Sequence, residues 1–155
     1  MNTTSRRVLL ASMLCLGVSA TAFAGNLPAT GLGQAWPNAA DVSASPSFHV
    51  YVFMLGGVKY VQVNDMNGNV LGAVGTAGGQ FITLPVGRFA QLVTTPQDSA
   101  AVTTTATPSA APAVVYQDGV TTVTATPLSD GTLQLNAAAA ATGNCDPIEC
   151  NNHIQ

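Results

Sequence analysis

Two glycine-containing turns within residues 48–74 constrain the fold of this chain more than any other feature. Gly56-Gly57 separates a β-branched and aromatic run, 48–55, from a second such run, 58–64. Two runs of this kind joined by two glycines predict a β-hairpin, because glycine adopts positive φ without a steric penalty. The hairpin fixes a register in which Val52 lies opposite Val61 and Phe53 lies opposite Tyr60.

This register sorts the side chains of the hairpin onto two faces, since successive residues of a strand point to opposite sides of the sheet. One face collects apolar side chains and the stem of a lysine: Val50, Val52, Met54, Lys59, Val61 and Val63. The other face is aromatic and polar: Tyr51, Phe53, Tyr60 and Gln62, with His49 near its end.

The second turn extends the hairpin into a three-stranded meander. Asn67-Gly68 is a strong hairpin signal, and the run 70–74 follows it. A tight turn at this dipeptide places Val74 opposite Val61, and therefore on the valine face. Two independent turns thus predict the same core face, which strengthens the assignment.

Further strands are predicted in the rest of the chain. The run 81–84 restarts a strand, and the apolar run 86–93 allows one or more short strands. Asp118-Gly119 predicts a second hairpin with Val114 opposite Val123 and Tyr116 opposite Thr121, and a short alternating strand follows at 132–135. We expect an all-β fold, a small antiparallel meander or sandwich or an incomplete barrel, with no helix longer than one or two turns after residue 24.

The N-terminus has the layout of a secretory signal peptide. Arg6 and Arg7 precede an apolar stretch, 8–20, and Ala22-Phe23-Ala24 supplies small residues for cleavage before Gly25. The paired arginines leave general secretory and twin-arginine export as alternatives. We expect an exported protein, periplasmic or secreted.

The remaining segments are assigned by composition. The arm contains the single tryptophan, Trp36, and we expect burial of its large ring to dock the arm onto the core. The tail contains Cys145 and Cys150, which we expect to form a disulfide in an oxidising compartment. A metal site of these cysteines with His153 is the alternative. The predicted divisions are a signal peptide (1–24), an extended arm (25–47), a β-meander core (48–94), a Thr/Ala/Pro linker (95–112), a second hairpin region (113–136) and a flexible tail (137–155).

The scarcity of charged and nucleophilic groups argues against several functions. Charged residues make up 7% of the chain, and only four are basic, which excludes an electrostatic nucleic-acid binder. His49 and His153 are the only histidines, and no Gly-x-Ser-x-Gly motif is present. We therefore expect neither an enzyme nor a bound cofactor.

The aromatic face formed by Tyr51, Phe53 and Tyr60 is the candidate binding site. It either meets solvent and binds a partner, or it is covered by the second hairpin as core. The expected function is a non-catalytic binding or structural component of the bacterial cell envelope, with an envelope or extracellular protein or a glycan as partner. A self-assembling or strand-adding subunit is the alternative, and a small metal-binding protein or enzyme is a second one.

Overall fold

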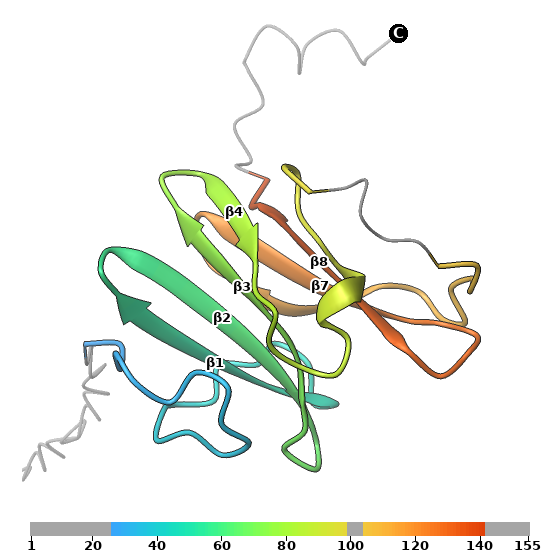
Figure 1. Cartoon of the computed structure of the whole chain (residues 1–155), viewed down its shortest axis with the longest axis horizontal. Coiled ribbons are helices and arrows are strands. Elements are labelled where there is room, and N and C mark those ends of the chain that lie inside the picture. Colours follow the sequence, from blue (N-terminus) through green and yellow to red (C-terminus); the bar gives the residue numbers. More distant parts are fainter. Residues whose placement is uncertain (1–25, 99–103, 142–155) are drawn as a thin grey trace, which may run out of the picture.

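The structure, a computed structural model, describes residues 26–98 and 104–141. This part of the chain is all-β and forms two four-stranded sheets, with strand orders β1-β2-β3-β4 and β5-β8-β7-β6 (Figure 1). The first sheet contains β1 (Phe48–Leu55), β2 (Val58–Asp65), β3 (Val70–Ala77) and β4 (Gln80–Thr83). The second contains β5 (Val93–Thr94), β6 (Ala113–Gln117), β7 (Thr121–Pro127) and β8 (Leu133–Ala139). The sheets stack face to face and do not close into a barrel. The predicted all-β class is therefore confirmed. Of the predicted architectures, the described residues form two packed sheets.

The first hairpin has the predicted register. Val52 pairs with Val61 and Phe53 pairs with Tyr60. Gly56 and Gly57 have φ values of +58° and +81°, as a two-residue turn of this hand requires. The two glycines and the alternation of apolar side chains therefore predicted this hairpin correctly.

The second turn reaches the predicted register by a different route. Val61 pairs with Val74 as predicted, but the register shifts by one residue between Val63 and Asn64. The turn itself is longer than the expected Asn67-Gly68 turn. Its closing hydrogen bond runs from the Asp65 backbone N–H to the carbonyl of Asn69, at 2.9 Å. The Asp65 carboxylate also accepts the Asn69 N–H at 2.8 Å. This capping carboxylate favours the longer turn, and the irregularity in the ladder restores the pairing beyond it.

The predicted register of the second hairpin is wrong. Tyr116 pairs with Val123 rather than with Thr121, and Val114 pairs with Thr124 rather than with Val123. The cause is Asp118, whose Oδ1 accepts the backbone N–H of Thr121 at 2.7 Å and that of Val120 at 2.9 Å. This side-chain cap moves the reversal one residue along the chain.

The run 86–93 also differs from the prediction, since most of it is not a strand. It contains a 3-10 helix, η1 (Ala90–Leu92), and only its last residue enters β5, which pairs in parallel with β8. The Arg88 and Phe89 N–H groups instead donate to the carbonyls of Val70 and Leu71 at 2.9 Å and 2.8 Å. The chain thus lies against β3 as it crosses from one sheet to the other.

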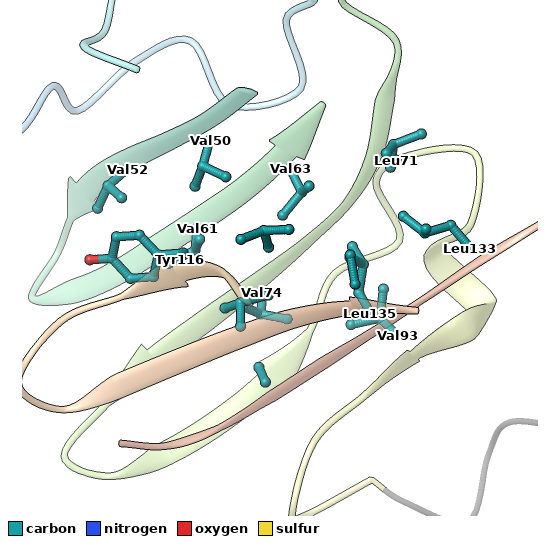
Figure 2. Close-up of a cluster of buried hydrophobic side chains, with 14 of the residues drawn as sticks. Val50, Val52, Val61, Val63, Leu71, Val74, Val93, Tyr116, Leu133 and Leu135 are labelled. Carbon is teal, nitrogen blue, oxygen red and sulfur yellow. The ribbon is translucent and has the colours of Figure 1, made fainter. Parts of the chain in front are cut away.

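The core lies between the two sheets and is built on the predicted valine face. Figure 2 shows Val50 and Val63 of the first sheet pointing toward Val93 and Leu135 of the second. Met54 departs from the prediction, because it is 39% exposed at the end of β1. The buried core residues are Val50, Val52, Val61, Val63, Leu71, Val74, Phe81, Val93, Val115, Tyr116, Val123, Ala125, Leu133, Leu135 and Ala137.

A polar clasp joins the sheets at the rim of this core. Lys59 of β2 forms an ion pair with Asp118, and the Tyr116 hydroxyl donates to the same carboxylate at 2.7 Å. Burial alone would raise the pKa of Asp118, but the hydrogen bonds from Lys59, from two backbone N–H groups and from Tyr116 lower it to about 2. Burial and the neighbouring carboxylate raise the pKa of Tyr116. The clasp therefore holds an ionised carboxylate.

We expect the clasp to lose its contribution to stability as the pH falls from about 4 to about 2. The pKa of Asp118 is lower in the folded chain than its ordinary value of 3.8, so acid protonates this carboxyl first in the unfolded chain and favours unfolding. Because the side chain is 32% exposed, solvent screening reduces the expected loss to about 1–2 kcal/mol. The free energy of unfolding, measured in urea at a series of pH values from 6 to 2, gives this loss. Asp118→Asn should flatten this pH dependence, and identical pH profiles for the two proteins would contradict the assignment.

Regular structure extends into two segments that were predicted to be a linker and a flexible tail. β8 runs to Ala139, into the segment predicted as a tail, and Ser109 of the predicted linker donates its N–H to the Pro127 carbonyl at 2.9 Å. The predicted signal peptide and the pair Cys145 and Cys150 lie outside the described residues. No helix in the described ranges has the length and apolar character needed to cross a membrane.

Candidate functional site

The three predicted aromatic residues lie on the outer face of the first sheet, away from the core between the sheets. Tyr51 and Phe53 are 5% and 1% exposed, and Tyr60 is partly exposed. The second hairpin covers the valine face, so it is not what buries them. The arm N-terminal to β1 does so instead, and Gly31 of this arm lies against the Phe53 ring. The structure therefore does not present Tyr51, Phe53 and Tyr60 together as an open surface.

The arm also runs along the free edge of β1. Val42 donates its N–H to the Val50 carbonyl at 2.8 Å, and Met54 donates its N–H to the Pro28 carbonyl at 3.0 Å. Unpaired strand edges invite pairing with other chains, and covering them is a common protection. The arm occupies the edge of β1 that a strand-adding partner would need.

Two buried amide side chains of β2 hold the arm in place. Gln62 accepts the Gly33 N–H at 2.6 Å and donates to the Gln34 carbonyl at 2.8 Å. Asn64 donates to the Ala35 carbonyl at 2.7 Å, and its Oδ1 accepts from Gln62 at 2.9 Å. Both side chains are 0% exposed. The arm backbone supplies the partners that these buried amides need, and the same hydrogen bonds fix residues 33–35.

Trp36 follows directly on this fixed segment and projects into solvent. Its side chain is 58% exposed, although it is the only tryptophan of the chain. The indole rests on the backbone of Gly68, where an added Cβ would lie only 2.6–2.8 Å from three indole atoms. The His49 ring packs against the indole in a T-shaped arrangement with centroids 5.2 Å apart. The indole is therefore both exposed and held.

His49 is in turn positioned by the arm. Its Nδ1 lies 2.7 Å from Oδ2 of Asp41, and its ring stacks on Tyr51 with centroids 6.3 Å apart. Burial alone would raise the pKa of Asp41, but hydrogen bonds from His49 and from the N–H groups of Val50 and Ser43 lower it. Burial, together with the Asp41 carboxylate, raises the pKa of Tyr51. The Asp41 carboxylate thus joins the arm, β1 and the histidine.

We call the group of Trp36, His49, Asp41 and Gly68 the Trp36 platform. It is a fixed aromatic surface with polar groups at its border. The sequence prediction named Tyr51, the innermost ring of this stack, but missed Asp41 and the two amides. The sequence did contain one signal for the two amides. Gln62 and Asn64 alternate with valines on a strand, and a segment rich in proline and glycine, with no strand of its own, precedes the sheet.

The described residues contain no group of three or more His, Cys, Asp or Glu side chains able to hold a metal ion. Comparison of the chain with protein-family models, with curated proteins and with solved structures finds no match.

Proposed function

We propose that this chain is an exported, non-catalytic binding module of the bacterial cell envelope, and that the Trp36 platform is its binding surface. The observation that carries the proposal is an exposed indole, 58% accessible, held by the fold on two sides. Large aromatic side chains are normally buried, and an exposed one with a polar border is typical of interaction surfaces.

Rigidity adds to this support. Binding immobilises side chains, and each mobile side chain costs about 0.5–1.5 kcal/mol to order. The amides of Gln62 and Asn64, the contact with Gly68 and the packing of His49 order Trp36 before any ligand arrives. The signal peptide predicted for residues 1–24 supports an envelope location, since it would direct the chain out of the cytoplasm.

Trp36→Ala should weaken binding of the signal-free chain, residues 25–155, to isolated bacterial envelopes about thirtyfold or more. Loss of a central aromatic contact costs about 2 kcal/mol or more at many interfaces, which corresponds to about a thirtyfold loss of affinity. Co-sedimentation of the protein with washed envelopes, measured over a range of protein concentrations, gives the affinity of each variant.

Leu55→Ala provides the matched control. Leu55 is 56% exposed at the tip of the first hairpin, so its removal deletes a similarly exposed apolar side chain at the turn between β1 and β2. This variant should bind as the unchanged protein does. Equal losses in the two variants, or envelope binding that does not require Trp36, would refute the proposed surface.

A further inference from the structure

We propose that the ligand of the Trp36 platform is a neutral sugar ring, presented by an envelope or extracellular polysaccharide. The inference rests on the proposed function and names the chemical class that its binding surface takes. It follows from three properties of the platform: a fixed indole, a lack of available cations and a border of hydrogen-bonding groups.

The fixed indole favours a flat, rigid ligand with an apolar side. Gly68 occupies one side of the indole and His49 packs against it, yet the side chain stays 58% exposed. A pyranose ring presents C–H groups on one side and hydroxyls around its edge. It can therefore cover an aromatic ring while it keeps its hydroxyls hydrogen-bonded, and a long flexible side chain would lose more entropy at the same place.

The charges of the platform disfavour an anionic ligand. In the described ranges the basic side chains are Lys59 and Arg88, and Lys59 is paired with Asp118. The Arg88 guanidinium lies 5.6 Å above the Phe89 ring. The Asn69 hydrogen bond and the Arg88 charge both lower the pKa of Asp65, the carboxylate of the turn that carries Gly68, so Arg88 already faces an opposite charge. A second carboxylate, Asp41, lies at the platform itself and is 40% exposed beside His49. A phosphate- or sulfate-bearing polymer, or an anionic lipid surface, would meet a carboxylate where it needs cations.

Hydrogen-bonding groups at the border match the hydroxyls of a sugar. Asn67 is exposed and directly precedes Gly68, on which the indole rests. His49 uses Nδ1 toward Asp41, which leaves Nε2 as the ring nitrogen for a ligand. The exposed Asn69 amide donates to Asp65 at 2.7 Å and so stiffens this turn. Amide and imidazole nitrogens and amide oxygens are groups that pair with sugar hydroxyls.

Tryptophan fluorescence tests the inference directly, because Trp36 is the only tryptophan of the chain. The signal-free protein is titrated with neutral hexasaccharides of glucose, mannose and N-acetylglucosamine in several linkages, with a heparin-derived hexasaccharide and with phosphatidylglycerol vesicles. We expect a saturable blue shift with at least one neutral hexasaccharide, little changed between 50 mM and 500 mM salt. Calorimetry should show at least a tenfold loss of affinity in Trp36→Ala, and partial retention in Trp36→Phe.

Gly68→Ala is the second variant, since it keeps the indole but forces it off its seat. It should weaken sugar binding while circular dichroism still shows a folded β-protein. A response only to heparin or only to vesicles overturns the inference in favour of an anionic polymer or a membrane. If no hexasaccharide binds but envelope binding still requires Trp36, the ligand class is wrong and the proposed function stands. If envelope binding is also independent of Trp36, both are wrong.

Discussion

Gly87→Ala should destabilise the fold by more than about 3 kcal/mol, a large share of the total stability of a domain of this size. Gly87 has a φ of +105°, and an added Cβ would lie 2.5 Å from the Leu71 carbonyl carbon and 2.6 Å from the Gly72 nitrogen. Both contacts are with backbone, which cannot rotate away. Relief would require the crossing segment to leave β3, with loss of the hydrogen bonds of Arg88 and Phe89 to that strand. Urea unfolding at pH 7 measures the change.

Gly79→Ala is the control for Gly87→Ala, because it tests the cost of a positive φ without a steric clash. Gly79 also has a positive φ, +79°, but nothing lies within 4 Å of an added Cβ. This variant should lose only about 1 kcal/mol, the usual cost of a left-handed alanine. Similar losses at positions 79 and 87 would show that the crossing segment does not lie against β3 as described.

Gln62→Leu should release the arm and lower the free energy of unfolding by about 2–3 kcal/mol. Leucine fills much of the same space, but it removes the partner of the Gly33 N–H and of the Gln34 carbonyl, and it leaves the buried Oδ1 of Asn64 without its donor. The arm backbone groups regain hydrogen bonds when this segment moves into water. Chymotrypsin should then cleave after Leu32 much faster than in the unchanged protein, and mass spectrometry of the fragments follows the cleavage.

Gln80→Leu is the matched control, because Gln80 is an exposed strand residue of the same sheet. It should change neither stability nor cleavage after Leu32 appreciably. Rapid cleavage after Leu32 in the unchanged protein would contradict the role given to the buried amides, as would a Gln62→Leu variant that is as resistant as the control.

The part of the fold that the sequence predicted well is the part in which local rules agree. At Gly56-Gly57 a two-residue turn sets the register, and alternation then places the valines of both strands on one face. Packing completes the prediction, because the second sheet needs an apolar face and this is the one available.

The predicted register failed where a side chain, rather than the backbone preference of the turn residues, determines the position of the turn. Asp118-Gly119 resembles a tight turn, but the Asp118 carboxylate caps Val120 and Thr121 and shifts the pairing of the whole hairpin. The same carboxylate also binds Lys59, a residue far away in the sequence. The turn dipeptide alone therefore does not encode where this carboxylate places the reversal.

The site was harder to predict than the fold for a related reason. Alternation told which side of the sheet carries Tyr51 and Phe53, but it gave no information about what lies over that side. The arm has no strand or helix period, and its position depends on hydrogen bonds from Gln62 and Asn64 to its backbone. Trp36 stood out in the sequence only as a ring that would dock and be buried, whereas the structure leaves it in solvent.

The manner in which the arm is held has a consequence for how such a protein can diversify. Gln62 and Asn64 grip only main-chain atoms of residues 33–35, so they are indifferent to the side chains displayed nearby. A substitution at position 36 therefore leaves these hydrogen bonds in place, although it removes the ring contacts with Gly68 and His49. Under the proposed function, attachment of the arm and choice of ligand then depend on different residues, and exchange of one outward-facing residue would alter specificity.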